Sequence, residues 1–173
     1  MRNIIKDRAL VPNDWQLLRL QEDQTVESVV VPAGLVILPL AVWLAQRDTL
    51  QARTDIGVWI ASSERPEVLR EDVARLPLIA VDFPKFTDGR GYSIAYQLRA
   101  RLAYTGELRA VGDVLRDQLY YMQRVGFNAF DVRADRDVED ALQGLTDFSV
   151  PYQNSWDQKA PLFARVQRNG VAA

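Results

Sequence analysis

The strongest constraint on the fold is an alternation of strand-like and helix-like runs from residue 56 to residue 145. The strand-like runs are short and mostly apolar, and the residues after each run repeat their apolar positions at helical spacing. Four strand–helix units in a row predict an α/β fold with a mainly parallel sheet and right-handed crossovers. The predicted strands are residues 56–60, 78–81, 107–111 and 127–132, and the predicted helices are residues 66–74, 92–103, 113–125 and 137–145.

Chain length separates the parallel architectures that this alternation allows. With 173 residues, the chain is too short for a closed barrel of eight strand–helix units, which takes about 250 residues. An open, twisted sheet with helices on both faces is the favoured arrangement. A half-barrel-like arc that pairs with a second copy is the alternative.

The predicted organisation is one domain followed by a tail. Residues 1–148 form a single α/β domain, in which residues 1–34 are expected to make short strands, including one at 26–31. A helix is expected to begin after Pro39. Residues 149–173 lack periodicity and form an irregular C-terminal tail, which is either a strap across the domain or an arm that docks on a partner.

Two residue types are absent, and their absence excludes several kinds of chemistry in this chain. Without cysteine or histidine, it has no disulfide, no thiolate or imidazole metal ligand and no histidine base. The formal net charge of −2 gives no basic face for nucleic acid. No metal site is expected, and no motif identifies a cofactor, so the cofactor is unknown.

The apolar stretches predict neither a membrane-spanning helix nor a signal peptide. The longest of these, residues 35–45, is too short to cross a bilayer and contains Pro39. The charged residues near the start are not followed by the apolar core of a signal peptide. A cytoplasmic protein with no membrane partner is therefore expected.

Three polar loops follow predicted strands and should meet at one edge of the sheet, where parallel sheets bind ligands. These rim loops are residues 82–93, 112–117 and 133–137. Backbone N–H groups at a helix start, together with cationic side chains, suit a phosphate, sulfate or carboxylate, and Gly89 and Gly91 are expected to allow positive φ. The predicted ligand-binding residues are Lys85, Thr87, Asp88, Gly89, Arg90, Gly91, Ser93, Gly112, Arg116 and Arg133.

Asp88 and Asp113 are the candidate catalytic groups, because either carboxylate could act as a general base beside a bound anion. A structural interpretation competes with this one. In it, the carboxylates cap helices or pair with the arginines, and the glycines only make a turn. The loop is neither a dinucleotide turn nor a Walker loop, so both interpretations stay open.

Three segments resemble a bacterial family, domain of unknown function family 934. They read DFPKFTDGRGYS at residues 82–93, GELRAVGDVLRDQ at residues 106–118 and GFNAF at residues 126–130, and the resemblance covers roughly residues 30–140. Members of that family are commonly described as oxidoreductases of sulfite reduction, encoded beside the sulfite reductase haemoprotein. The resemblance implies a role in sulfur assimilation, although this chain has no recognisable residues for a metal centre or a dinucleotide.

Three functions are compatible with the resemblance and the rim loops. The first is an accessory protein of assimilatory sulfate and sulfite reduction, which holds a small anion and associates with sulfite reductase or its electron donor. The second is an enzyme, a possible oxidoreductase, that acts on a small sulfur oxyanion or a phosphorylated metabolite. The third is a structural subunit that binds no ligand. A homodimer is possible in each case.

Overall fold

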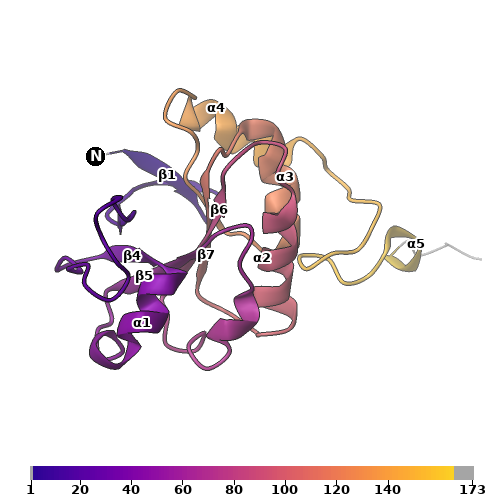
Figure 1. The fold of residues 1–173 in the computed structure, drawn as a ribbon. Coiled ribbons are helices and arrows are strands. Elements are labelled where there is room, and N and C mark those ends of the chain that lie inside the picture. The colour runs from indigo at the N-terminus through magenta and orange to yellow at the C-terminus, as the bar shows by residue number, and fades with distance from the viewer. Residues whose placement is uncertain (1, 166–173) are drawn as a thin grey trace, which may run out of the picture.

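A computed structural model describes residues 2–165, which form an α/β fold around one eight-stranded sheet (Figure 1). The strand order is β2-β1-β8-β7-β6-β5-β4-β3. Strands β3 to β8 pair in parallel, whereas β1 pairs antiparallel with both β8 and β2. The strands are β1 (Asn3–Lys6), β2 (Ala9–Pro12), β3 (Gln16–Leu17), β4 (Val36–Pro39), β5 (Ile56–Ile60), β6 (Leu78–Phe83), β7 (Glu107–Gly112) and β8 (Ala129–Phe130).

Helices alternate with the parallel strands, as the sequence predicted. Trp43 of the first helix and Leu98 of the second are buried in the main core. The second helix packs against β6 and beside the third (Figure 1). The helices are α1 (Leu40–Leu50), α2 (Arg90–Ala100), α3 (Arg116–Val125), α4 (Val138–Gln143) and α5 (Leu162–Arg165), with short 3₁₀ helices at Pro66–Leu69 and Gly144–Thr146.

The sheet is strongly curled, because its two edge strands are consecutive in the chain. β2 ends at Pro12 and β3 begins at Gln16, and four peptide steps reach at most about 14 Å. A flat sheet of eight strands would hold its edges about 34 Å apart. The sheet must therefore bend round until its edges come near each other.

Curling gives the sheet an outer and an inner face, and alternate side chains point to each. On β7, Leu108 and Ala110 belong to the main core together with helix residues such as Leu119. Val111, from the opposite face of β7, packs in a small second cluster with Ile37, Leu78 and Ala80. The helices α1 to α4 cover the outer face, and strand side chains fill the inner face.

The expectation of an open sheet with helices on both faces is wrong. Successive strands from β3 to β8 are neighbours in the sheet, and right-handed crossovers between neighbours place every helix on the same face. The alternative expectation, a half-barrel-like arc, describes strands β3 to β8 better. The sheet also has more strands than four units supply, because β3, β4 and the antiparallel pair β1-β2 extend it.

Two local expectations also fail. Residues 26–28 form a turn and residues 29–31 have no regular structure, so there is no strand. The carbonyls of Val26 and Val29 accept hydrogen bonds from the side chain of Gln46. Residues 66–74 contain only a 3₁₀ helix, Pro66–Leu69, followed by turns. In both segments tertiary contacts override local propensity.

The described part of the tail, residues 149–165, is irregular apart from α5, and we call it the strap. The rest of the predicted tail, residues 166–173, lies outside the described residues. The strap is held against α3 by Arg124, whose side chain donates to the carbonyl of Gln153 and pairs with Asp157 at 3.3 Å. It extends from the α/β body beside α3 (Figure 1).

None of the helices in residues 2–165 has the length and apolar character needed to cross a membrane.

Candidate functional site

The first rim loop contains a closed cluster of Ser62, Asp88 and Arg90. The Arg90 guanidinium donates to both oxygens of Asp88, at 2.9 and 2.7 Å. The Ser62 hydroxyl donates to Asp88 Oδ2 at 2.6 Å and accepts from Arg90 at 3.0 Å. These hydrogen bonds hold the pKa of Asp88 well below its usual range, and the bond from Arg90 contributes most. A carboxylate with such a low pKa is a weak general base at neutral pH.

Asp113 connects all three rim loops. Its Oδ1 accepts from Arg133 Nη1 at 2.8 Å, and its Oδ2 accepts from the backbone N–H of Phe86 at 2.9 Å. Arg133 also donates to both oxygens of Asp135, at 2.6 and 2.9 Å. The two carboxylates raise the pKa of Arg133, Asp135 contributing more. Asp113 thus joins the loops that follow β6, β7 and β8.

The rim glycines have different roles from those expected. Gly89 has φ of −81° and is the N-cap of α2. Gly91 does not have a positive φ either; it is needed for close packing, since a Cβ there would lie 2.5 Å from the Phe83 ring. Positive φ occurs instead at Gly112, at +95°, where the chain leaves β7. The expectation of positive φ at Gly89 and Gly91 is therefore wrong.

The remaining predicted rim residues lie in two places. Lys85, Thr87 and Ser93 are exposed. Arg116 pairs with Asp147 at 3.1 Å and Asp140 at 3.8 Å. Together with Asp117, Asp135 and Asp137 of the second and third rim loops, it lines a groove of about 660 Å³ near the start of α3. The structure thus brings Asp88 next to Arg90 and Asp113 next to Arg133, but satisfies each arginine with a carboxylate of the chain itself.

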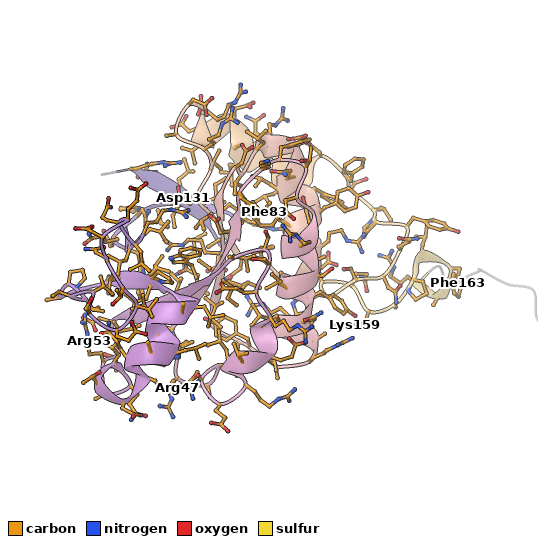
Figure 2. The ribbon with its side chains drawn as sticks, viewed as in Figure 1. Arg47, Arg53, Phe83, Asp131, Lys159 and Phe163 are labelled. Carbon is orange, nitrogen blue, oxygen red and sulfur yellow. The ribbon has the colours of Figure 1, made fainter. Side chains whose placement is uncertain are left out.

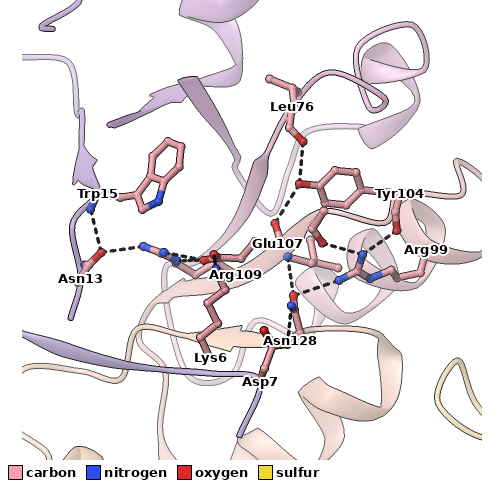
Figure 3. Close-up of polar contacts among 12 residues, drawn as sticks. Lys6, Asp7, Asn13, Trp15, Leu76, Arg99, Tyr104, Glu107, Arg109 and Asn128 are labelled. Carbon is pink, nitrogen blue, oxygen red and sulfur yellow. Dashed lines mark hydrogen bonds and ion pairs between the residues drawn. The ribbon is translucent and has the colours of Figure 1, made fainter. Parts of the chain in front are cut away.

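A second polar cluster lies on the inner face of the sheet, around β7 (Figure 3). Arg109 Nε donates to Glu107 Oε1 at 2.7 Å, and its Nη1 donates to Asn13 Oδ1 at 2.9 Å. The ammonium of Lys6 lies 2.7 Å from the other carboxylate oxygen, Glu107 Oε2. The side chains of Arg109 and Glu107 are only 2% and 7% exposed. We call Lys6, Glu107 and Arg109 the inner triad.

A cavity of about 470 Å³ opens beside the inner triad. Its polar wall includes all three triad residues, and its apolar wall includes Trp15 and Leu35. Figure 3 shows Trp15 and Asn13 on the side of Arg109 away from Arg99. A cavity of this size with few convergent polar groups is typical of small-molecule sites.

Further charges line the same face. Arg19 pairs with Asp82 at 2.7 Å and lies over the Trp59 ring, 5.0 Å from its centroid. Asp131 Oδ1 lies 3.1 Å from the Arg2 guanidinium, outside hydrogen-bonding geometry, so this buried oxygen has no donor among the described residues. Burial raises the pKa of Asp131, while Arg2 and Arg109 oppose that shift.

The inner triad was missed in the sequence because its members lie in strands, not loops. Glu107 and Arg109 occupy alternate positions of a predicted strand. That strand, β7, lies in the middle of the sheet, between β6 and β8. Its charged side chains are therefore buried on one face of the sheet and do not lie at an exposed edge. Two charged residues at alternate positions of a strand predicted to be central were the pattern that could have indicated this site.

A buried arginine near the triad, Arg99, has a structural role (Figure 3). It is 7% exposed and donates to the carbonyls of Tyr104, Gly106 and Gly126 at 2.6, 2.9 and 2.9 Å, and to Asn128 Oδ1 at 3.1 Å. Asn128 in turn accepts from the backbone N–H of Leu108. Arg99 thereby joins α2 to the segments that precede β7 and β8.

An exposed aromatic surface forms the third candidate, where the strap leaves α3. We call it the strap surface, and its members line a groove of about 330 Å³. The Tyr120 ring packs against Phe148 with centroids 4.8 Å apart. Phe163, also exposed, lies apart from them at the far end of the strap (Figure 2). The exposed members are Tyr121, Phe148, Val150 and Tyr152, of which Tyr152 is 77% exposed.

Residues 2–165 contain no group of three or more Asp or Glu side chains arranged to hold a metal ion.

Comparison with known proteins gives a family. Residues 57–163, more than half of the chain, match the family described as "Bacterial protein of unknown function (DUF934)". No curated protein and no solved structure matches the chain. The matched segment includes all three rim loops, β7 with its triad residues, and most of the described strap. The chain therefore belongs to the bacterial family DUF934.

Proposed function

We propose that the protein is a non-catalytic accessory protein of sulfite reduction, which docks through its strap surface on sulfite reductase or the electron donor of that enzyme. The observation that carries the proposal is the exposed aromatic group of Tyr121, Phe148 and Tyr152 around a groove. Aromatic residues gathered on a surface are typical of protein interfaces. The assignment to the sulfur pathway is based on the resemblance to the family.

The way the strap is anchored supports docking. Arg124 binds the strap at Gln153 and at Asp157, and Arg165 donates to the carbonyl of Pro151 at 2.7 Å. The aromatic side chains are therefore presented from a segment that is already fastened to α3. Such preorganisation lowers the entropy cost of binding a partner.

The hydrogen bonds of the rim loops favour an accessory role rather than catalysis on a sulfur oxyanion. Both oxygens of Asp88 and both of Asp113 already accept hydrogen bonds. Arg90 and Arg133 are each held by a carboxylate of the chain. A substrate anion would have to compete with these carboxylates, and a general base would have to be released from its donors first.

The test is co-purification with the sulfite reductase haemoprotein and its electron donor from the same bacterium. Phe148→Ser combined with Tyr152→Ser should reduce the bound fraction about tenfold or more, the effect of losing interface hot spots. The matched control is Val30→Ser, because Val30 is 85% exposed and lies outside the strap. Equal binding by the double variant and the wild type, with unchanged melting temperatures, would reject the strap surface as the docking site.

The pathway is tested separately by growth of a deletion strain. Loss of growth on sulfate, with rescue by cysteine, is expected for a protein of sulfite reduction. Normal growth on both sulfur sources would reject the assignment to sulfur metabolism.

A further inference from the structure

We infer that the cavity beside the inner triad is a binding site for a small organic carboxylate, one that carries an apolar group. This inference concerns the inner face of the sheet and is independent of docking by the strap surface. It rests on three features of the cavity: the net positive charge of the inner triad, apolar residues in the same lining, and a volume that suits a small molecule.

The inner triad has one positive charge more than its own carboxylate neutralises. Glu107 is shared, with Oε1 bound to Arg109 and Oε2 to Lys6. An ammonium has three N–H donors and a guanidinium has five. Among the described contacts, Lys6 directs its ammonium to Glu107 alone, and Arg109 directs its guanidinium to Glu107 and Asn13. Donors therefore remain for the carboxylate of a ligand, which would neutralise the triad.

Acidic residues also line the cavity, but they lie at its exposed side. Asp7 and Asp14 are both exposed, so water and salt screen their charges. Arg109, by contrast, is almost fully buried, and interactions of its charge with a bound anion are screened much less. Glu107 neutralises Arg109, so the remaining positive charge belongs to Lys6, whose side chain is 41% exposed. An anion is therefore favoured between Lys6 and the remaining N–H groups of Arg109.

The apolar residues of the cavity lining favour an apolar group on the ligand. They include Ile4, Val11, Trp15 and Leu35, and the Trp15 ring gives a flat surface against which a planar group can pack. Sulfate or sulfite alone would leave most of the 470 Å³ unfilled. An organic carboxylate satisfies the charged end and the apolar end together.

Stability alone does not account for the triad. Buried ion pairs lose solvation when they form, and apolar residues of similar volume often give equal or greater stability. The neighbouring inner-face positions Ile37, Leu78, Ala80 and Val111 are apolar, so apolar packing of this face is compatible with the fold. Binding of an anion accounts for the presence of the three charged residues on this face.

The probes are acetate, butyrate, benzoate and phenylacetate, with benzyl alcohol as the uncharged control. Binding is followed by calorimetry and by tryptophan fluorescence of the full chain at constant ionic strength. We expect saturable binding of the larger carboxylates, weak binding of acetate and none of benzyl alcohol. Benzyl alcohol binding as tightly as benzoate, or no saturable binding of any carboxylate, would overturn the inference.

Two variants locate the site. Lys6→Met should weaken benzoate binding about tenfold, the loss of one charge-assisted hydrogen bond, whereas Lys159→Met on the strap should leave it unchanged. Trp15→Phe should abolish most of the fluorescence change while binding persists in calorimetry. If Lys6→Met folds normally and binds benzoate like the wild type, the carboxylate lies elsewhere and the inference fails.

Discussion

Gly91 lies so close to Phe83 that a Cβ at position 91 would be 2.5 Å from Cζ of that ring. Phe83 cannot move aside easily, because it is fully buried and packs against Tyr92 and Phe127 with ring centroids 5.5 and 5.8 Å away. The start of α2 therefore approaches β6 only through a residue without a side chain. This contact fixes where the first rim loop meets the sheet.

Gly91→Ala should lower the free energy of unfolding by about 1–3 kcal/mol, the usual cost of overpacking a core. Gly89→Ala is the matched control, because Gly89 has nothing within 4 Å of its Cβ position and a φ of −81°. Its effect should stay within about 0.5 kcal/mol. Urea unfolding of both variants measures the difference, and equal stabilities would show that the Phe83 contact is not restrictive.

Arg99→Met should destabilise the fold by about 3 kcal/mol or more, because it leaves the acceptors at Tyr104, Gly106 and Gly126 without their donor. Arg101→Met, two residues along and exposed, should change stability by less than about 0.5 kcal/mol. Chemical denaturation of the pair provides the test. A small loss in Arg99→Met would mean that water replaces the guanidinium at these carbonyls.

Asp88 should stabilise the protein at neutral pH and lose this effect in acid. Its pKa is lower in the folded state than the ordinary 3.8, through its bonds to Arg90 and Ser62, so the unfolded chain binds its proton first as pH falls. Acidification below about pH 4 should therefore cost the wild type more stability than it costs Asp88→Asn. Urea midpoints between pH 7 and 2 test this, with the exposed Asp23→Asn as control. Parallel curves for the wild type and Asp88→Asn would contradict it.

Asp131 should behave in the opposite sense. Burial raises its pKa in the folded state, so the folded protein keeps this proton to higher pH than the unfolded chain does, and ionisation destabilises the fold. Asp131→Asn should raise the melting temperature at pH 7, and the gain should shrink as pH falls toward 3. Lower stability of Asp131→Asn at pH 7 would indicate that the Arg2 ion pair, 3.1 Å long, outweighs the cost of burial.

Local patterns predicted the alternating elements but not how they are arranged. Strand β5 and helices α1 and α2 lie close to their predicted positions, and Gly126 ends α3 with φ of +117°, as expected of a glycine at that place. The curl could not be predicted, since it depends on the pairing of Ile5 with Phe130. Periodicity carries no information on contacts so distant in sequence.

The candidate site was predicted in its composition but not in its pairing. The sequence places Asp88 and Arg90 in one loop, yet whether such neighbours bind each other or a ligand depends on side-chain direction. Ser62, which completes that cluster, comes from the end of another strand. The inner triad was harder still, because Lys6 and Glu107 meet only through the pairing of β1 with β8, the neighbour of β7.

The pairing of β1 with β8 also sets the order in which this protein can fold during synthesis. The β1-β2 hairpin is synthesised before the other strands of the sheet, whereas β8, its neighbour in the sheet, contains Phe130 and follows all of them. Pairings between such distant segments form slowly, and unpaired strand edges invite association with other chains. The edge of β1 that pairs with β8 therefore stays unpaired until the strands from β3 to β8 have been translated.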